Sequence, residues 1–283
     1  MKAKNCLIFG GSGQIGRHLI RKLTKNNYRV TVVTRNIHQK GHIIKTQGNA
    51  GYIEIIEANI FDETKIRELF KKSDICINLV GILYENKRNS FQNIHTLFPS
   101  ILAKLCKQYN LKHFIHLSAL GINQAVDSKY ARSKLEGEKD ILKNFPLSTI
   151  LRPSVVYSVD DNFTTNFMTL LNRLPIFPLY YSGKTKFMPI HSSDLVDIIF
   201  NVISIVVFFN LLKKFSENNY FIFISLMLFA LNYFLTSYSL EGRVYSFYCL
   251  ISLCFIDSYI GLINDKKNPT VIKFLYFLLF SLI

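Results

Sequence analysis

The stretch NCLIFGGSGQIGRHLI, residues 5–20, decides the fold of the amino-terminal part of this chain. An apolar run leads into Gly10, Gly13 and Gly16, spaced as GxxGxxG, and then into residues suited to a helix. Glycines in such a turn let backbone N–H groups approach a diphosphate at the positive end of the helix. The stretch therefore predicts a nucleotide-binding domain. A glycine-rich turn without a ligand is the alternative.

Short apolar segments and helical segments alternate up to about residue 157. This alternation predicts parallel strands joined by right-handed crossovers, so we expect an α/β fold with a doubly wound parallel sheet of the Rossmann type over residues 1–204. We expect strands at residues 5–10, 28–33, 52–57, 74–80, 113–118 and 148–154, and helices at residues 14–26, 62–72, 92–109 and 128–144.

The composition of the chain is basic, with 34 Lys and Arg against 19 Asp and Glu and a formal net charge of +15. Most of the excess lies in residues 1–204 and favours phosphate-bearing ligands, nucleic acid or an anionic membrane surface. A solvated, Lys-rich surface without a partner is the alternative. Arginines do not alternate with aromatic residues, so we expect no nucleic-acid partner.

The cysteines show no CxxC spacing, and Cys6 and Cys76 lie in apolar runs typical of strands. We interpret them as buried small residues in a reducing compartment and expect no metal site. The others are Cys106, Cys249 and Cys254. The apolar run before the first glycine is too short for the core of a signal peptide, so we expect a cytoplasmic domain.

The second predicted strand ends in VTVVTRN, where Arg35 has no Asp or Glu near it in the sequence. An acid at this place bonds the ribose 2′-hydroxyl of NAD, whereas an arginine can accommodate the 2′-phosphate of NADP. We therefore expect NADP(H) to be favoured over NAD(H). An exposed basic residue without a ligand is the alternative.

A candidate acid–base pair lies in SKYARSKLEGEK, where Tyr130 and Lys134 are four residues apart on one helix face. A neighbouring ammonium would stabilise the phenolate and lower its pKa. Tyr130 could then exchange a proton with a substrate oxygen while a nicotinamide exchanges hydride. Ser118, at the end of the fifth predicted strand, could hold that oxygen. A strand-end turn residue is the alternative for Ser118.

Together, the glycine triplet, NLVG after the fourth strand, Ser118 and YARSK resemble the short-chain dehydrogenase/reductase superfamily, of the extended or atypical type. A narrower likeness is to the NAD(P)H-binding accessory subunits of respiratory complex I and their bacterial NAD-dependent epimerase/dehydratase-like relatives. It covers about residues 4–204, through FGGSGQIGRHLI, NLVGILYE, FIHLSALGIN, YARSKLEGEK, LRPSVVY, DDNFTTNF and KFMPIHSSDLVD in that order.

The resemblance implies a set of cofactor contacts. The residues around the diphosphate would be Gly10, Gly13, Gln14, Ile15 and Gly16. Arg35 would meet the adenosine ribose, Asn59 and Ile60 the adenine, and Val80 and Gly81 would lie along the nucleotide. Lys134 would hold the nicotinamide ribose, with Pro153, Ser154 and Val155 beside the nicotinamide. Asn59 departs from the wider superfamily, where Asp is common, but an amide can also bond adenine.

The resemblance also bears on catalysis. Members like the complex I subunit keep the nucleotide as a structural element and are not known for turnover, although Ser118, Tyr130 and Lys134 permit catalysis. The first hypothesis is an NAD(P)(H)-binding accessory or assembly protein at a respiratory membrane complex. The alternative is an NADP-dependent oxidoreductase or nucleotide-sugar epimerase/dehydratase that uses Tyr130 as its acid–base.

Residues 205–283 predict a second part, a hydrophobic membrane segment. The runs Tyr220–Tyr238 and Val244–Ile263 are long enough to cross a bilayer, and Thr270–Ile283 is shorter. Lysines flank the two longer runs, so the positive-inside rule places the nucleotide-binding domain on the cytoplasmic side of the inner membrane. We expect two to three transmembrane helices. Ile198–Leu212 is interpreted as a last domain helix that continues into an interfacial stretch without spanning.

The stretch TSYSLEGRVYSFYCLISL faintly resembles multi-pass membrane glycosyltransferases that act on lipid-linked sugars. Asp257, within the second run, would face a cavity or partner or lie at the interface of a tilted helix. The usual continuation of the resembled family after SDLVD is absent. We therefore expect a truncated or fused segment, joined near Ser204. The alternatives are a membrane-tethered enzyme and a glycosyltransferase fragment with an incidental nucleotide-binding domain.

Overall fold

The fold is taken from a computed structural model, which describes residues 4–87, 89–125, 127–159, 161–173, 187–215 and 218–230. The chain divides into two compact units. The first is Lys2–Val196, and the second is Asp197–Ile283 together with Met1. Each unit is described by itself below.

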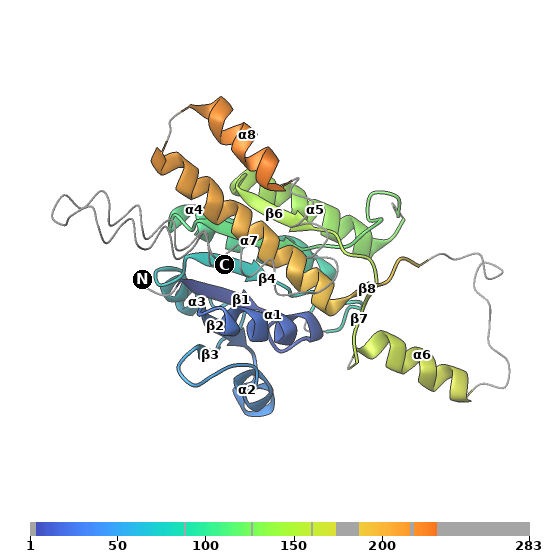
Figure 1. Cartoon of the computed structure of the whole chain (residues 1–283). Coiled ribbons are helices and arrows are strands. Elements are labelled where there is room, and N and C mark those ends of the chain that lie inside the picture. The colour runs from blue at the N-terminus through green and yellow to red at the C-terminus, as the bar shows by residue number, and fades with distance from the viewer. Residues whose placement is uncertain are drawn as a thin grey trace, which may run out of the picture. The chain divides into compact units, whose positions relative to one another are not determined.

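The first unit is built on a six-stranded parallel sheet with the order β3-β2-β1-β4-β5-β6 (Figure 1). The central strand is β1 (Asn5–Phe9), in which Ile8 pairs with Val32 on one side and Ile77 on the other. The other strands are β2 (Arg29–Thr34), β3 (Ile53–Glu57), β4 (Ile75–Asn78), β5 (His113–Leu117) and β6 (Ser148–Leu151). The strand order reverses between β1 and β4, and doubly wound folds bind ligands at the carboxyl ends of the strands there.

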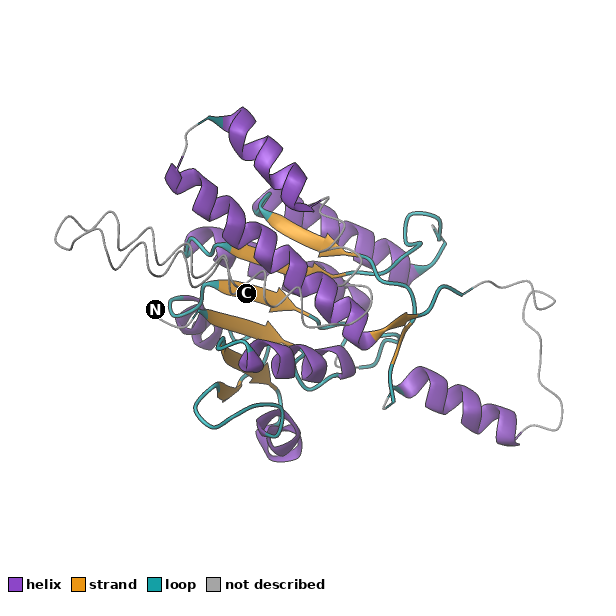
Figure 2. Ribbon diagram, viewed as in Figure 1, coloured by secondary structure: helices purple, strands orange, loops and turns teal. Residues whose placement is uncertain are grey.

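Helices cover both faces of the sheet, so the predicted Rossmann-type α/β fold is confirmed (Figure 2). They are α1 (Gln14–Lys25), α2 (Ile37–Lys45), α3 (Glu63–Phe70), α4 (Phe98–Gln108) and α5 (Lys129–Asn144), with the π-helix η1 (Gln92–Leu97) leading into α4. One core cluster joins Leu7 and Phe9 of β1 to buried residues of α3, α4 and α5 and contains none from α1. The buried face of α1, with Leu19, Ile20 and Leu23, therefore packs on the opposite side of the sheet.

Local sequence signals explain where some helices begin. Asp62 caps α3, because its carboxylate accepts a hydrogen bond from the N–H of Lys65 at 3.2 Å. The helix α2 was not expected, because Ile37–Lys45 is largely polar and lacks a helical apolar repeat. Its start is nevertheless marked by Asn36, whose side chain accepts from the N–H of Gln39 at 3.0 Å.

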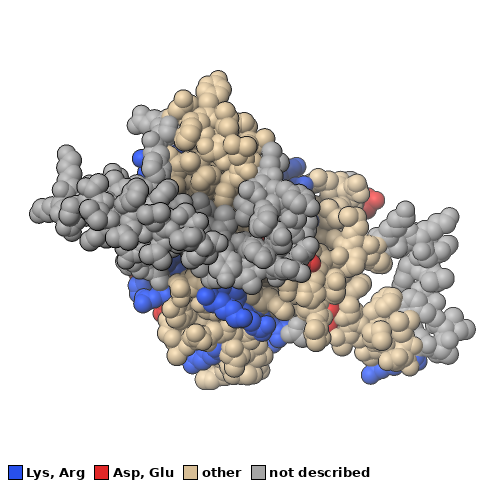
Figure 3. Space-filling model, in the orientation of Figure 1, with Lys and Arg blue, Asp and Glu red and all other residues tan. Residues whose placement is uncertain are grey.

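The surface of the first unit is basic, as its composition predicts. Helix α1 carries Arg17, Arg21, Lys22 and Lys25 and no Asp or Glu. On the face shown in Figure 3, Lys and Arg atoms are more prominent than those of Asp and Glu. This charge is compatible with phosphate-bearing ligands, and it also keeps a folded domain soluble.

A small second sheet follows the main one. It pairs β7 (Val156–Tyr157) in parallel with β8 (Ile190–His191). Between them lies α6 (Asn162–Arg173), which begins after Asp161. The Asp161 carboxylate accepts hydrogen bonds from both the N–H and the hydroxyl of Thr164, each at 2.6 Å, and so fixes the start of this helix.

The carboxyl-terminal helices are α7 (Ser192–Phe215) and α8 (Asn219–Ala230). Among the described residues, α7 alone is long and apolar enough to cross a membrane, and half of that stretch is buried. Core helices of other proteins have the same length and composition, so this helix alone does not show a membrane span. The helix runs without a break from Ser192 through the predicted interfacial stretch Ile198–Leu212.

Most of the predicted membrane segment lies outside the described residues. The run Tyr220–Tyr238 is described only as far as Ala230, and the glycosyltransferase-like stretch is not described. The runs Val244–Ile263, which contains Asp257, and Thr270–Ile283 also lie outside. The transmembrane helices therefore stay a prediction.

An ion pair between α5 and the end of β6 gives a prediction about stability. The Glu138 side chain is 2% exposed and accepts hydrogen bonds from Arg152 Nε at 2.9 and 3.2 Å, with a further contact from Nη2. Arg152→Ala leaves this buried carboxylate without its hydrogen-bonded cation. We expect the free energy of unfolding to fall by about 1–3 kcal/mol, less than for a fully buried pair because Arg152 is partly exposed.

Arg67→Ala is the matched control, because Arg67 pairs with Glu63 on the exposed side of α3 at 3.1 Å. This variant should unfold at the same urea concentration as the wild type. Urea denaturation of both variants is the measurement, and equal effects would contradict a special contribution from the buried carboxylate.

Candidate functional site

The turn after β1 brings the strand and α1 into direct backbone contact. Gly10 has a φ of +83°, and its carbonyl accepts a hydrogen bond from the N–H of Gly13 at 3.1 Å. A Cβ on Gly16 would lie 2.6 Å from the Gly10 carbonyl oxygen and from the Cα of Gly11. No side chain fits at position 16, so the helix can begin directly against the strand end.

The first turn of α1 is suited to an anion. Its N-cap, Gly13, supplies no side-chain hydrogen bond, and the turn contains no acidic residue. The N–H groups of Gln14, Ile15 and Gly16 are therefore available to phosphate oxygens at the positive end of the helix. The Gln14 Nε2 atom is buried and has no hydrogen-bond partner within the protein. These residues fit the diphosphate of a dinucleotide.

A cavity of about 400 Å³ lies at the carboxyl ends of β2 and β3. Three residues predicted to meet the adenosine, Arg35, Asn59 and Ile60, line it together. The Asn59 Oδ1 atom accepts the N–H of Phe61 at 3.1 Å, which leaves its NH₂ group available to a ligand. The other lining residues are Glu57, Ala58, Phe61, Lys65 and Asn89. The adenosine of a dinucleotide fits at this end of the crevice.

Glu57 was missing from the sequence-based prediction. No acid lies near Arg35 in the sequence, but Glu57, which ends β3, lines the same cavity in space. Its carboxylate accepts the N–H of Ile37, at the start of α2, at 3.4 Å. Parallel pairing places Glu57 beside Thr34, so the end of the neighbouring strand was the signal that could have revealed it.

The loop after β4 lies next to the glycine turn. A Cβ on Gly10 would lie 3.1 Å from the nitrogen of Val80, so the two turns are neighbours. The Asn78 side chain, buried in β4, accepts the N–H of Val80 at 3.0 Å and holds this loop in place. A Cβ on Gly81 would lie 3.5 Å from the ammonium nitrogen of Lys134. The structure thus brings the predicted residues Val80, Gly81 and Lys134 together.

Lys134 is a buried cation, with 4% of its surface exposed. Its ammonium donates a hydrogen bond to the carbonyl of Leu117 at 3.0 Å. Burial lowers the pKa of Lys134 to about 8, while Glu138, one helical turn further along α5, acts in the opposite direction. The group therefore keeps its proton at neutral pH and can donate to a ribose hydroxyl.

Tyr130 lies in a different environment from the one expected. Its ring packs edge-on against His95 and Phe91, with centroid distances of 5.2 and 5.8 Å. Burial raises the pKa of Tyr130 above its ordinary value. The expectation that Lys134 lowers this pKa is wrong, because burial among rings dominates and the ammonium donates to a backbone carbonyl instead.

His95 is a second residue that the sequence did not reveal. Its Nε2 accepts the N–H of Ile82 at 3.1 Å, and its Nδ1 lies 3.0 Å from the Ser133 hydroxyl. That hydroxyl donates to the carbonyl of Tyr130 at 2.8 Å, so the imidazole is neutral with its proton on Nδ1. Burial and the nearby charge of Lys134 lower the pKa of His95 to about 3.

Ser118 is buried beyond the end of β5, and its hydroxyl has no hydrogen-bond partner within the protein. An unbonded buried hydroxyl costs free energy, which a polar ligand atom would recover. Ser118 therefore does not bond Tyr130 here. The segment Pro153, Ser154 and Val155 lies close by, because the carbonyl of Pro153 accepts the N–H of Leu120 at 2.9 Å.

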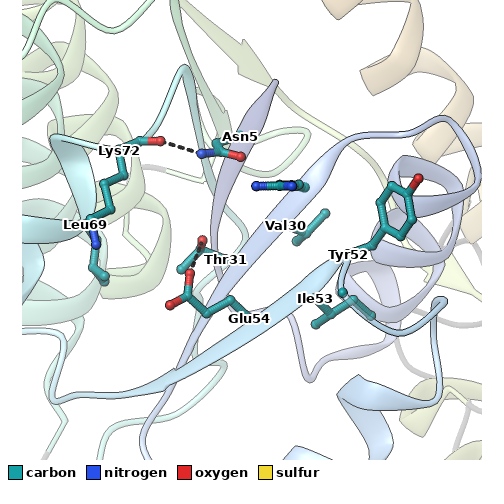
Figure 4. Close-up of a pocket in the computed structure, with 10 residues that line it drawn as sticks. Asn5, Val30, Thr31, Tyr52, Ile53, Glu54, Leu69 and Lys72 are labelled. Carbon is teal, nitrogen blue, oxygen red and sulfur yellow. Dashed lines mark hydrogen bonds between the residues drawn. The ribbon is translucent and has the colours of Figure 1, made fainter. Parts of the chain in front are cut away.

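A second hollow, of about 370 Å³, lies at the amino ends of β1, β2 and β3 (Figure 4). Figure 4 shows Asn5 donating to the carbonyl of Lys72 at 2.8 Å and Thr31 donating to the Glu54 carboxylate at 3.3 Å. None of the predicted site residues lines this hollow. Ligands of doubly wound sheets bind at the opposite edge, so we exclude it from the candidate site.

The neutral imidazole of His95 predicts an effect of pH on stability. Its pKa is about 3 in the folded protein, against an ordinary 6.5, so unfolding takes up a proton at lower pH. The stability that the neutral ring contributes is complete above pH 6.5 and is lost as the pH falls towards 3. When the pH falls from 7 to 5, the free energy of unfolding should therefore decrease by about 2 kcal/mol less in His95→Asn than in the wild type.

His38→Asn is the control, because His38 is exposed on α2 and should leave the pH dependence unchanged. Urea denaturation at both pH values measures the two slopes. If His95→Asn and the wild type lose the same free energy, His95 is not held neutral in the folded protein.

The sequence matches known proteins over the region that forms this site. Residues 6–205 match the NAD dependent epimerase/dehydratase family. The mitochondrial NADH dehydrogenase (ubiquinone) 1 alpha subcomplex subunit 9 of Arabidopsis thaliana is 28% identical over 66% of this chain and 47% of its own length. The subunit of the same name from Dictyostelium discoideum is 30% identical over 69% of this chain and 54% of its own. The chain thus spans about half the length of these curated relatives.

A solved structure agrees with the fold. DesIV (dTDP-glucose 4,6-dehydratase) from Streptomyces venezuelae, with NAD and TYD bound, superposes with a TM-score of 0.59 at 16% identity, over 70% of this chain and 71% of that one. At such an identity the likeness establishes the fold alone. The family match supplies what the fold cannot, namely the binding of a nicotinamide dinucleotide. The chain therefore belongs to the NAD dependent epimerase/dehydratase family and is a distant homologue of NADH dehydrogenase (ubiquinone) 1 alpha subcomplex subunit 9.

Proposed function

We propose that this protein binds NADP(H) in preference to NAD(H) and retains it without turnover, as an accessory or assembly protein of a respiratory membrane complex. The observation that carries the proposal is the geometry around Tyr130: its ring packs edge-on against His95 and Phe91, the Ser118 hydroxyl has no partner within the protein, and the Lys134 ammonium donates to the carbonyl of Leu117. A phenol that keeps its proton can donate a hydrogen bond, but it cannot remove a proton from a substrate at neutral pH.

The chain's own residues hold the cofactor at three points. The N–H groups at the start of α1 bind the diphosphate, Arg35 meets the 2′-phosphate, and the ammonium of Lys134 meets the nicotinamide ribose. When bound, the cofactor supplies a nicotinamide ring that exchanges hydride. In the accessory role this ring stays unused, and binding free energy stabilises the folded domain instead.

An NADP-dependent oxidoreductase or nucleotide-sugar epimerase/dehydratase is the second candidate, and Ser118 favours it. Its buried, unbonded hydroxyl is available to a substrate oxygen. In this alternative Tyr130 delivers a proton to that oxygen, and Lys134 holds the cofactor beside it. The presence of Ser118, Tyr130 and Lys134 supports the candidate, and the raised pKa of the phenol opposes only a role for Tyr130 as a base.

The placement at a membrane is part of the proposal. The name of the mitochondrial relatives supports an accessory role in NADH dehydrogenase. Residues 1–204 would form a cytoplasmic domain, and residues 205–283 two to three transmembrane helices. The apolar length of Tyr220–Tyr238 and Val244–Ile263 supports this arrangement. The exposed apolar side chains of α8, among them Phe223 and Leu228, also support it.

Retention without turnover can be tested on the purified full-length protein. We expect NADPH to raise the melting temperature and to remain bound through gel filtration. Oxidation of NADPH in the presence of a panel of carbonyl compounds and nucleotide sugars should stay at background, because in the accessory role the nicotinamide is not used for hydride transfer. Absorbance at the NADPH band measures both retention and turnover. Turnover that disappears in Tyr130→Phe would replace the accessory role by the enzyme.

A matched pair of variants controls the binding itself. Gly13→Asp places a carboxylate where the diphosphate binds, yet an acid at a helix N-cap is compatible with folding. It should lose the NADPH-dependent shift without losing its own stability. Gln39→Glu adds the same charge in the first turn of α2 and should keep the shift. If the wild type shows no shift with either dinucleotide, nucleotide binding is refuted.

The preference for NADP(H) depends on Arg35. Arg35→Ser should weaken NADPH binding by about 10–100-fold and leave NADH binding nearly unchanged, because hydrogen bonds to charged groups contribute about 1.5–3 kcal/mol. Glu57→Gln, which removes the acid from the same cavity, should strengthen NADPH binding. Fluorescence titration gives the dissociation constants. An unchanged ratio of NADPH to NADH affinity in Arg35→Ser would show that Arg35 does not read the 2′-phosphate.

A further inference from the structure

His95 has a fixed position between two parts of the nucleotide crevice. It belongs to the π-helix η1, an element often found at functional sites, and the residue is 1% exposed. A Cβ on Gly137 of α5 would overlap the carbonyl oxygen of His95, so the backbone of η1 lies directly against α5. The Thr96 hydroxyl donates a further hydrogen bond to the carbonyl of Ser133 at 3.0 Å. These contacts fix the point from which the His95 ring extends.

The two nitrogens of the His95 ring bond to different elements. Nδ1 lies 3.0 Å from the Ser133 hydroxyl of α5, and Nε2 accepts the N–H of Ile82 at 3.1 Å. Because the Ser133 hydroxyl donates to the carbonyl of Tyr130, the ring proton is on Nδ1 and the Nε2 lone pair is directed at Ile82. The neutral imidazole therefore links α5 to the loop after β4.

The linked part of the loop borders the place expected for the nicotinamide ribose. Ile82 directly follows Val80 and Gly81, the two residues expected along the nucleotide. A Cβ on Gly81 would lie 3.8 Å from Nε2 of His95 and 3.5 Å from the ammonium nitrogen of Lys134. A movement of this loop would therefore change the space beside the lysine that is expected to hold the ribose.

We propose that His95 is a positioning residue for the nicotinamide half of the bound dinucleotide. By accepting the N–H of Ile82, it fixes the distance between the loop after β4 and the ammonium of Lys134, so that the ribose fits between them. The adenosine half binds in the cavity beyond β2 and β3 and does not depend on His95. The inference rests on the proposed function, because it requires a dinucleotide in the crevice.

Two ligands distinguish the halves of the crevice. NADPH occupies both ends, whereas adenosine 2′,5′-bisphosphate lacks the nicotinamide and its ribose. Isothermal titration calorimetry of the full-length protein gives a dissociation constant for each ligand, and the ratio of the two constants reports on the nicotinamide end alone. His95→Leu removes the acceptor for the N–H of Ile82, and His95→Gln keeps an acceptor on a side chain of similar length.

We expect His95→Leu to weaken NADPH binding by about 3–10-fold, because one hydrogen bond that shapes the site is lost, and to leave the binding of adenosine 2′,5′-bisphosphate unchanged. His95→Gln should recover most of the NADPH affinity. His113→Leu is the control for the loss of a buried imidazole. His113 is 8% exposed and begins β5 at the edge of the sheet away from the crevice, where its Nε2 lies 2.8 Å from the Thr149 hydroxyl. This variant should keep both dissociation constants.

Ser133→Ala is a second variant that tests the same link, because alanine is compatible with the interior of α5 and the change removes the partner of Nδ1. It should weaken NADPH binding alone by about 2–5-fold, and it still provides the test if His95→Leu does not fold. A ratio equal to that of the wild type in either folded variant, or an equal loss of affinity for both ligands, overturns the positioning role. A wild-type protein that binds neither ligand overturns the proposed function, and this inference with it.

Discussion

The contact between the carboxyl end of β1 and the first turn of α1 is the constraint on which the rest of the structure depends. No side chain separates them, because a Cβ at Gly16 would overlap the Gly10 carbonyl. The helix therefore starts with uncapped N–H groups at the crevice between β1 and β4. Every other element of the site is placed relative to this point: the cavity beyond β2 and β3 on one side, and the loop after β4 with Lys134 on the other.

Much of this architecture follows from local sequence signals. Apolar β-branched runs predicted the six strands. The family resemblance predicted that Arg35, Asn59 and Ile60 meet the adenosine, and the three residues line one cavity. Local signals did not predict features that depend on contacts formed only in the folded protein. The polar helix α2 lacks the apolar repeat by which a helix is predicted from sequence. Glu57 comes close to Arg35 only because β2 pairs with β3.

The largest difference between expectation and structure concerns Tyr130. Four-residue spacing does place Tyr130 and Lys134 on one helix, but spacing says nothing of what else packs there. The ring of His95, brought in by η1, and that of Phe91 surround the phenol, and desolvation then decides its pKa. Residues that bind a nucleotide use backbone groups and strand ends, which sequence order largely determines. Residues that transfer protons depend on solvation, which only the assembled core determines.

The carboxylate of Glu138 serves two cations, the guanidinium of Arg152 and the ammonium of Lys134. Arg152 lies on the segment that follows the edge strand β6 and leads directly into Pro153, and its side chain is partly exposed. A substitution of Arg152 would remove one of the two cations, so the Glu138 carboxylate would interact with Lys134 alone. The pKa of Lys134 would then change. Natural substitutions of Arg152 could therefore change the pKa of Lys134 without changing Lys134 itself or its neighbours in the nucleotide site.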